Sequence, residues 1–514
     1  MNEEDEILGL SLTPTTTINF PVLISESFES NSTLNEIFVT FNIGGTKVLG
    51  KLLKPKTINP LLDESRSQEL FDYLKRFGPY GGLDGPDSRL ATCEIIGFKD
   101  RGELIKLQNA PSSQILVKLA TKNDLEYFFG RERDVIKMMY PRGAANFLLP
   151  IDPKTFFLHA DIVAPTGAGK TYIGAILAVA LNGKNIGVIN KEGGKEIRKI
   201  KTWILDITGQ IAEDGYGIFK NLKDDPRMII HLEELQIESA IELAAAIEQS
   251  YQFDKMPFRH PQIKSLVCDW MRMFLENKKK WDYYSFLGIL RESIEKAYKD
   301  EQLAKRTIVQ TMDRLETFNG ENIWEKKIEQ RLKAPYSIED LCTYADQGKM
   351  IVFDLTYAEP YEKPIFASVL LKKLYDKAIG EYSFKRTEYG FSTIVFIDEV
   401  QDYCPQDFPA WYQEDCKPLI IDIAKKGRKF GLGLVLMTQR YAGVDKEALT
   451  QMNTHFTGNV TYGDRTSVQN NQGVIAEDLN SLRLYEFYFS GLACPISKMI
   501  IKGVPPEDVQ RIIE

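Results

Sequence analysis

Hydrophobic positions in residues 1–130 fall in short runs rich in β-branched and aromatic side chains, a pattern typical of β-strands. Ile37–Ile43 and Thr46–Leu53 flank a Gly-Gly pair, and this arrangement predicts a hairpin with a tight turn. Glycine and proline gather in Gly78–Pro86, which we expect to be a loop. Further strands are predicted at Ala91–Phe98, Glu103–Leu107 and Gln114–Leu119. Several short strands with turns between them predict a small N-terminal β-barrel domain over residues 1–130.

From Leu149 onward, strand-like and helix-like segments alternate, which is the pattern of a parallel β-sheet covered by helices. We expect this α/β core to occupy residues 131–223 and 337–490. Its predicted strands include Met350–Leu355, Thr393–Ile397, Leu432–Met437 and His455–Val460.

The alternation stops in residues 224–336, where hydrophobic positions recur at helical spacing. Amphipathic stretches run through Ile263–Glu276 and Tyr284–Leu315, so we predict a helical insertion into the core over this range. Residues 491–514 are expected to form a C-terminal extension. The stretch from Ser481 predicts two strands, followed by a short helix after a Pro-Pro pair.

Length and composition favour a globular protein of several domains. A chain of 514 residues is too long for one hydrophobic core, and 43% hydrophobic with 26% charged residues is ordinary for such a protein. No apolar run is as long as a bilayer span requires. Four of the first six residues are acidic, whereas a secretory signal begins with basic residues. We therefore expect a cytoplasmic protein that makes no contact with a membrane.

Cysteine spacing and net charge narrow the possible chemistry. The six cysteines lie far apart and only four histidines are present, so reduced thiols are favoured over a zinc site or disulfides. The net charge of −8 excludes a surface that coats polyanions in general. Any nucleic-acid contact must come from a local basic feature, such as the lining of a pore.

The strongest chemical signal is a phosphate-binding loop. Its residues are Ala164, Pro165, Thr166, Gly167, Ala168, Gly169, Lys170, Thr171 and Tyr172. An apolar strand ends at Val163 just before them, and a helix over Tyr172–Leu181 follows. In such a loop the backbone N–H groups converge on phosphate oxygens, the lysine reaches the β- and γ-phosphates, and the threonine hydroxyl binds Mg²⁺.

One position departs from the pattern G-x-x-x-x-G-K-[ST], because Ala164 stands where the first glycine is usual. We expect that position to tolerate a small side chain more readily than Gly167 or Gly169. The alternative interpretation is an ordinary glycine-rich turn before a helix. The adjoining Lys-Thr pair, strand and helix favour the nucleotide site.

Two acids end a continuous apolar strand at Thr393–Ile397, as expected of a central parallel strand buried on both faces. The carboxyl ends of such strands open onto the crevice that holds the ligand. Asp398 is predicted to hold Mg²⁺ through water, and Glu399 to orient the attacking water. Alone, the motif is weak, because acids often cap strands at a protein surface.

A third predicted strand, Leu432–Met437, ends in Thr438, Gln439 and Arg440. An amide at a neighbouring strand end can sense the γ-phosphate, so Gln439 is the candidate sensor. Without the two other motifs, a solvated loop would be the favoured interpretation.

Several segments together resemble the HerA family and, more loosely, FtsK. The run from Gly427 through Gly431, followed by residues 434–440, resembles the family's "GRKxG…TQR" segment. Asp206–Gln210 resembles "DPHGE", and Met350–Thr356 resembles "vvDLS". The order of these pieces covers nearly the whole chain, although the N-terminal match is one of arrangement only.

The resemblance implies a RecA-like core in a homohexameric ring that hydrolyses ATP with Mg²⁺ and pumps double-stranded DNA. It also implies an N-terminal barrel that docks a partner, either a NurA-like nuclease or a sirtuin-type or other effector of antiphage defence. Arg428 matches the arginine that a neighbouring subunit directs at the γ-phosphate, where a fixed cation stabilises the developing charge. Arg440 and Arg465 are weaker alternatives. The lysines around Arg428 fit a solvated face or a DNA contact equally well.

Three departures separate this chain from the archaeal members of the family. Leu158-His159 stands where Arg-His is common, Gln210 replaces a glutamate, and residues 183–201 form an unusually long polar hairpin. They favour a divergent bacterial or defence-associated branch.

Three other functions compete with the DNA motor. One is a ring scaffold that assembles and activates an effector under the control of ATP, without moving DNA. A coupling or packaging ATPase is less favoured, since conjugative couplers usually carry N-terminal membrane helices. A protein-unfolding motor is the least favoured, because the expected helical lid is missing.

Overall fold

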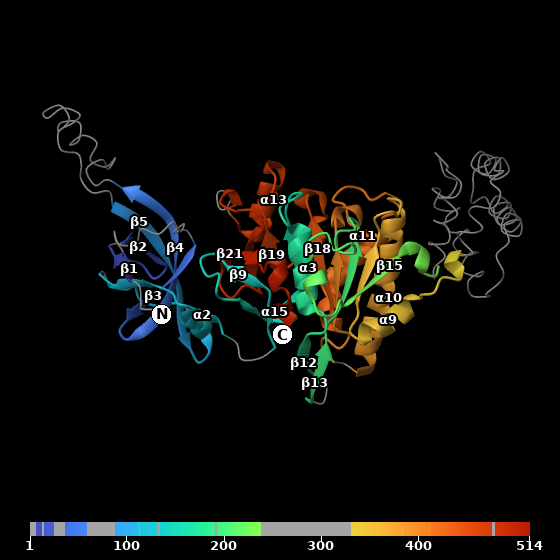
Figure 1. Ribbon diagram of the computed structural model, residues 1–514, viewed down its shortest axis with the longest axis horizontal. Coiled ribbons are helices and arrows are strands. Elements are labelled where there is room, and N and C mark those ends of the chain that lie inside the picture. Colours follow the sequence, from blue (N-terminus) through green and yellow to red (C-terminus); the bar gives the residue numbers. More distant parts are fainter. Residues whose placement is uncertain are drawn as a thin grey trace, which may run out of the picture. The chain divides into compact units, whose positions relative to one another are not determined.

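The computed structural model describes residues 7–12, 15–24, 36–58, 88–112, 114–130, 134–190, 193–237, 330–385, 387–410, 412–474 and 479–513. The chain forms two compact units (Figure 1). One consists of Met1–Ile151 and Cys494–Gly503, and the other of Asp152–Ala493 and Val504–Glu514.

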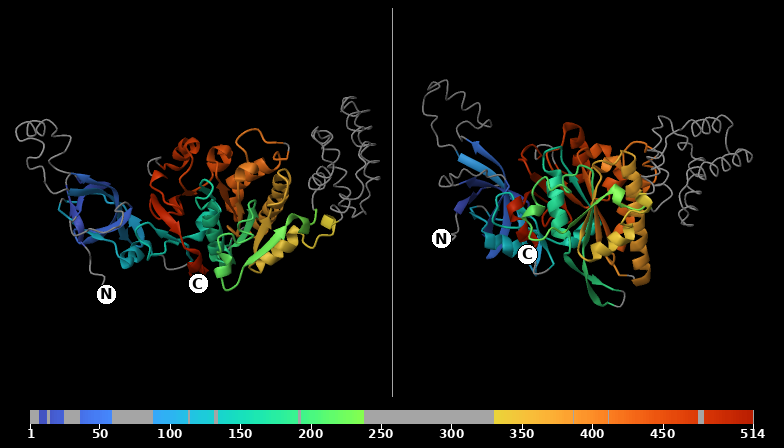
Figure 2. Two further views of the ribbon diagram at one scale, coloured as in Figure 1. Left: turned by 45° about the horizontal axis from the view of Figure 1, so that its top comes forward. Right: turned by 45° about the vertical axis from the view of Figure 1, so that its right-hand side comes forward.

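The first unit contains a closed antiparallel barrel. Its strands are β1 (Ile7–Ser11), β2 (Asn19–Ile24), β3 (Ile37–Ile43), β4 (Thr46–Ile58), β5 (Ser88–Asp100) and β7 (Leu116–Leu119). They pair in the order β2-β1-β7-β3-β4-β5, and β5 pairs with β2 to close the ring (Figure 2, left). Closure removes exposed strand edges. The predicted barrel is confirmed, and β6 (Glu103–Ile105) extends it beside β5.

The barrel is filled by side chains from alternate strand positions, as its period of two requires. Phe20 and Phe41 meet edge to face with ring centroids 5.2 Å apart. Val39, Val48 and Val117 are fully buried in the same cluster.

The first unit continues beyond residue 130, where the sequence analysis ended the barrel domain. Helix α2 (Lys122–Phe129) begins at a capping box in which Thr121 and Asp124 bond each other's backbone N–H groups. Short strands β8 (Ile136–Lys137) and β10 (Pro150–Ile151) pair with each other. Strand β9 (Met139–Pro141) pairs with β21 (Lys498–Gly503), which draws part of the predicted C-terminal extension into this unit.

The second unit is built on a parallel sheet. The strand order is β15 (Arg227–His231), β16 (Met350–Asp354), β14 (Lys201–Asp206), β17 (Thr393–Ile397), β18 (Leu432–Thr438), β11 (Ala160–Val163) and β19 (Thr454–Thr457). Every residue of β11, β16, β17 and β18 is buried, which explains their continuous apolar sequences. Strand β20 (Glu486–Gly491) pairs antiparallel with β19. The predicted RecA-like α/β core is confirmed.

Helices pack on this sheet (Figure 1). Two contacts show a close approach where side chains are small or flat. All of α3 (Lys170–Leu181) is buried, and a Cβ on Gly174 would lie 2.4 Å from the sulfur of Met437 on β18. Phe366 of α10 (Glu362–Lys385) packs on Phe353 of β16, with ring centroids 4.9 Å apart. The other α-helices among the described residues of this unit are α9 (Ile338–Asp346), α11 (Cys416–Phe430), α12 (Lys446–Leu449), α13 (Tyr462–Gln472) and α15 (Gln510–Ile513).

Strand β15 corrects the predicted start of the helical insertion. Its residues lie inside the range 224–336, yet they pair in parallel with β16 as part of the core sheet. The strand escaped the sequence analysis because it is short, and only Ile230 within it is buried. The stretches Ile263–Glu276 and Tyr284–Leu315, assigned to the insertion, lie outside the described residues.

The structure also bears on the predicted polar hairpin, on the cysteines and on membrane-spanning helices. The polar hairpin over residues 183–201 is present, as β12 (Asn185–Ile189) paired antiparallel with β13 (Lys195–Lys199). Cys93, Cys342, Cys404, Cys416 and Cys494 are buried free thiols. Among the described residues, no helix is both long enough and apolar enough to span a bilayer.

Candidate functional site

The phosphate-binding loop occupies the turn between β11 and α3. Gly167 and Gly169 have φ angles of +81° and +98°, in the left-handed region that favours glycine. A Cβ on Gly167 would meet nothing within 4 Å, so the loop leaves open space at this point. Gly169 is the N-cap of α3 and provides no side-chain cap, so the first N–H groups of the helix are available to an anion.

Ala164 fits the loop because of a glycine elsewhere in the chain. The Ala164 side chain is fully buried against Gly458, which follows β19. A Cβ on Gly458 would lie 2.7 Å from the Cβ of Ala164, too close for both residues to carry one. The methyl group of Ala164, which a glycine would lack, therefore fits because residue 458 is a glycine and has no side chain.

Lys170 and the two acids meet at the carboxyl end of the sheet. The Lys170 Nζ lies 2.8 Å from Asp398 Oδ1 and 2.5 Å from Glu399 Oε1. Burial alone would lower the pKa of Lys170, but the two carboxylates raise it above its usual range. Burial also raises the pKa of Asp398, against the opposing effect of Lys170. One cation is thus shared by two acids, and the group attracts further positive charge.

Glu399 is held in a strained backbone conformation, with φ 48° and ψ 55°. Its Oε2 accepts hydrogen bonds from Gln401 Nε2 at 2.9 Å and from the Gln439 backbone N–H at 3.3 Å. The Thr438 hydroxyl donates in turn to Gln401 Oε1 at 2.7 Å. Gln401 therefore links the acid on β17 to the end of β18, a role that the sequence analysis missed.

Gln439 lies against the tip of the phosphate-binding loop. The Thr166 hydroxyl donates to Gln439 Oε1 at 2.6 Å. The same residue thus contacts Glu399 through its backbone and the loop through its side chain. Gln439 is thereby connected to both parts of the site.

The segment after β14 approaches Asp398 from the other side. Asp206 is buried and accepts from the N–H groups of Ile211 and Ala212, at 2.8 and 2.9 Å, which fixes the turn. Burial raises the pKa of Asp206, and these hydrogen bonds oppose the shift. The Thr208 hydroxyl lies 3.3 Å from Asp398 Oδ2, so the turn also contacts the acid of β17.

Thr171 and Gln210 are connected through Tyr216. The Tyr216 hydroxyl donates to Gln210 Oε1 at 2.9 Å, and it is also hydrogen-bonded to the Thr171 side chain. A threonine hydroxyl oxygen carries two acceptor lone pairs, which can bind a metal ion. Gln210, which stands where the HerA family has a glutamate, is uncharged and accepts the hydrogen bond from Tyr216.

Arg428 lies exposed in the last turn of α11. Its lysine neighbours are engaged within the chain: Lys425 pairs with Glu447, Lys426 pairs with Asp422, and Lys429 lies 4.9 Å from the Tyr382 ring centroid. No ion pair involves Arg428 within the described part of the chain. Of the other candidates, Arg465 donates to Asn480 at 2.8 Å, whereas Arg440 is exposed as Arg428 is.

His159, which follows the Leu158 that stands where the family commonly has arginine, has a structural role. It is buried, and its Nδ1 accepts from the Leu434 N–H at 3.0 Å. Burial lowers the pKa of His159 to about 4, so the ring is neutral near pH 7. The residue joins the start of β11 to β18 and contributes no charge.

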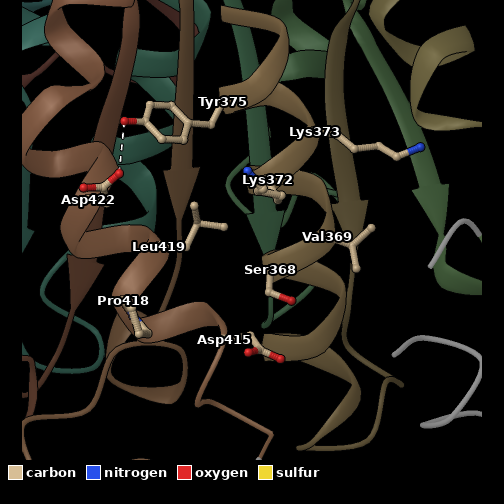
Figure 3. Close-up of a pocket in the computed structure, with 9 residues that line it drawn as sticks. All are labelled: Ser368, Val369, Lys372, Lys373, Tyr375, Asp415, Pro418, Leu419 and Asp422. Atoms are coloured by element: carbon tan, nitrogen blue, oxygen red, sulfur yellow. Dashed lines mark hydrogen bonds between the residues drawn. The ribbon is translucent and has the colours of Figure 1, made fainter. Parts of the chain in front are cut away.

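A separate hollow of about 580 Å³ lies between α10 and α11 (Figure 3). Its lining includes Lys372, Lys373 and Leu419, and the Tyr375 hydroxyl donates to Asp422 at 3.1 Å on one side. None of the phosphate-loop residues and neither Asp398 nor Glu399 lines it. The chemistry of the site is therefore concentrated at the strand ends.

The arrangement suits transfer of a phosphoryl group to water. An anion cradle, a buried lysine, a hydroxyl with available lone pairs and two carboxylates lie together at one edge of the sheet. Oxygen ligands of this kind match Mg²⁺, which is usually held by one or two side chains together with phosphate oxygens. Thr171 and Asp398 fit a metal ion, and Glu399 is positioned beside them.

Comparison with known proteins agrees with this geometry. No family model matches the chain. The DNA double-strand break repair helicase HerA of Pyrococcus furiosus is 22% identical over 461 residues, covering 83% of this chain and 78% of that protein. HerA of Sulfurisphaera tokodaii is 21% identical over 450 residues, covering 87% and 81%.

Among solved structures, VirB4 of Thermoanaerobacter pseudethanolicus aligns with a TM-score of 0.44 and 14% identity, covering 73% of this chain and 97% of that one. A score of this size is too low to support an argument about function. The similarity to the two HerA proteins spans most of both sequences.

Proposed function

We propose that the chain is a HerA-like P-loop ATPase that hydrolyses ATP and uses the free energy to move double-stranded DNA. The observation that carries the proposal is the contact of Lys170 with Asp398 and Glu399 at the end of an open phosphate-binding loop. Two HerA proteins that align over most of the chain are named as DNA repair helicases, which supports DNA as the substrate.

Each residue has a defined part in the proposed reaction. The backbone of residues 164–169 and the Lys170 amine bind the phosphates, and Thr171 and Asp398 hold Mg²⁺. Bound magnesium supplies charge neutralisation at the β- and γ-phosphates. Glu399 orients the attacking water and accepts its proton. Gln439 detects the γ-phosphate through its contact with the loop.

Lys170 changes partners during the cycle. Before nucleotide binds, the two carboxylates satisfy its charge. Phosphate oxygens then replace them, which frees Asp398 for the metal and Glu399 for water. The exchange keeps the buried ammonium paired throughout, and an unpaired charge there would be costly.

The active assembly is proposed to be a homohexameric ring in which Arg428 completes the site of a neighbouring subunit. Its exposure at the end of α11, with no ion pair in the described part of the chain, leaves the guanidinium available to a neighbour. We further propose that the N-terminal barrel docks a nuclease or another effector, in DNA end processing or antiphage defence. The closed barrel with its own core supports such a docking module.

The decisive experiment measures ATP hydrolysis with and without duplex DNA. Lys170→Ala and Glu399→Gln should both abolish turnover, whereas Lys372→Ala, at an exposed lysine paired with Asp376, should not. Duplex DNA should stimulate the wild-type rate. Hydrolysis that persists in Lys170→Ala refutes the assignment of the site. A rate indifferent to DNA refutes the motor and favours the ring scaffold.

A further inference from the structure

Three tyrosine rings gather beside the start of α3. Tyr485 lies directly against the phosphate loop, since a Cβ on Gly169 would be 2.4 Å from its Cδ1 atom. The Tyr485 and Tyr172 ring centroids are 5.4 Å apart, and those of Tyr172 and Tyr216 are 5.5 Å apart. Tyr172 is buried, whereas Tyr485 and Tyr216 are half-buried. Aromatic surface is therefore accessible next to the phosphate site.

Tyr485 is presented on a strained turn. Its φ of 64° lies in the left-handed region, which is unfavourable for a bulky residue. The Glu486 carboxylate accepts from the Arg483 N–H at 2.8 Å, and the Glu486 N–H donates to the Arg483 carbonyl at 3.1 Å. These bonds hold the turn that places the ring against Gly169. Strain of this kind is concentrated at ligand clamps and other functional sites.

Tyr172 forms a fixed support behind Tyr485. Its hydroxyl donates to the Val504 carbonyl, so the ring cannot turn toward solvent without losing that bond. Tyr216 packs edge-on against its other side. Tyr485 thus rests on an anchored neighbour.

Tyr216 lies toward Thr171 and Asp398, whereas Tyr172, on which Tyr485 packs, points to another flank of the loop. Lys170 and its carboxylates mark the side of the γ-phosphate. Tyr172 follows Lys170 by two positions, about 200° around a helix of 3.6 residues per turn, and therefore faces away from those acids. A nucleotide whose terminal phosphate meets Lys170 extends its sugar and base toward the opposite flank, where Tyr485 contacts Gly169 and Tyr172.

We infer that Tyr485 is the surface on which the base of the bound nucleotide stacks, supported by Tyr172. The inference rests on the proposed nucleotide site and adds a base subsite to it. Stacking uses the π-face that every base possesses, so the ring contributes affinity without reading the base edge. The phosphate contacts fix the position of the ligand, and the tyrosine retains its nucleoside end.

The test compares a ligand that carries a base with one that lacks it. Calorimetry on the full chain gives dissociation constants for Mg²⁺-ATP and for Mg²⁺-tripolyphosphate. Tyr485→Ala should weaken ATP binding by about 5- to 150-fold, the usual range for loss of one base stack. Tripolyphosphate affinity should stay unchanged, and Tyr485→Phe should bind ATP like the wild type. Tyr462→Ala, at a residue 88% exposed, is the matched control and should alter neither constant.

The outcomes separate this inference from the proposed function. Equal losses for both ligands, or unchanged ATP affinity, overturn base stacking. If the wild type binds neither ligand, the nucleotide site itself is refuted. If Tyr485→Ala fails to fold, Tyr485→Asn replaces it, because asparagine tolerates the left-handed backbone at this turn.

Discussion

Two buried lysines, one in each unit, have nearly the same partners and different surroundings. Lys51 in the barrel lies 2.9 Å from Glu36 and 3.7 Å from Glu94, while Lys170 in the core lies 2.8 Å from Asp398 and 2.5 Å from Glu399. Lys51 also donates to the Lys498 carbonyl at 3.0 Å, which ties its third proton to the backbone. Lys170 instead borders a loop of left-handed glycines with open space at Gly167.

The difference shows that a buried lysine paired with two acids is not in itself a sign of catalysis. The partners of Lys51 are two acids and a backbone carbonyl, with no phosphate-binding loop beside them. The partners of Lys170 stand at strand ends beside an anion cradle, so an incoming phosphate can replace them. What distinguishes a functional charge is whether the fold offers it a second set of partners.

The largest expected effect concerns Arg428, a third charged residue, whose partner we expect to lie in another subunit. Arg428→Ala should lower ATP turnover by about a thousand- to a hundred-thousand-fold, the usual effect of removing an arginine finger. Lys429→Ala in the same turn should have little effect. Mixing Arg428→Ala subunits with Lys170→Ala subunits should restore measurable hydrolysis, since some sites then regain both groups. An absence of recovery in stable mixed rings contradicts action in trans.

Lys51→Met is expected to damage the fold and spare the chemistry. Removing one partner of a buried ion pair leaves unpaired charge, at a cost of about 3–5 kcal/mol in unfolding free energy. Hydrogen exchange should locate the loss in the barrel strands, and ATP turnover per folded molecule should stay at the wild-type level. Adding Glu36→Gln should recover part of the stability. If Lys51→Met lowers ATP turnover without lowering stability, Lys51 also serves the reaction, and the proposed difference between the two lysines is wrong.

Gln401→Ala tests the neutral link that orients Glu399. A hydrogen bond to a charged group contributes about 1.5–3 kcal/mol, so turnover should fall by roughly 10- to 150-fold. The dissociation constant for Mg²⁺-ATP should not change, because Gln401 contacts the acid and not the loop. Gln469→Ala, at an exposed glutamine of α13, serves as the control. A parallel loss of ATP affinity and thermal stability would indicate a merely structural role.

His455 and Asp161 give the smallest expected effect. His455 Nδ1 lies 2.9 Å from the fully buried Asp161 carboxylate, which Gln472 also contacts. Burial acts to lower the pKa of His455, but Asp161 outweighs it and raises the value. A raised folded-state pKa stabilises the protein at pH values below the unfolded value of about 6.5 and ceases to do so as pH rises through the folded value.

The melting temperature should therefore fall by about 1–2 °C between pH 6 and pH 9 for each kcal/mol of lost pairing. His455→Gln should remove that part of the pH dependence. If the pH profile of the melting temperature is the same in wild type and variant, the pair contributes nothing. If the pair does contribute, His455 and Asp161 are, like Lys51 and its acids, a charged pair that serves stability alone, although they lie in the same unit as Lys170.

The site was predictable from sequence where chemistry follows local pattern. Lys170 and Thr171 belong to one loop motif, and Asp398 and Glu399 end a strand that is apolar because it is buried on both faces. Gln401 and Tyr485 were not predictable. Their roles depend on left-handed turns and on contacts between segments distant in sequence, such as Tyr485 with Gly169. Strand β15 was missed for a related reason, since a short edge strand has little apolar pattern.

The pairing of Ala164 with Gly458 changes what counts as a phosphate-loop signature. The spatial requirement is that only one methyl group occupy the gap between two neighbouring backbones, and either backbone can carry it. A glycine absent from the motif can thus be compensated nearly three hundred residues downstream. Pattern searches that demand the first glycine will overlook a phosphate-binding loop of this kind.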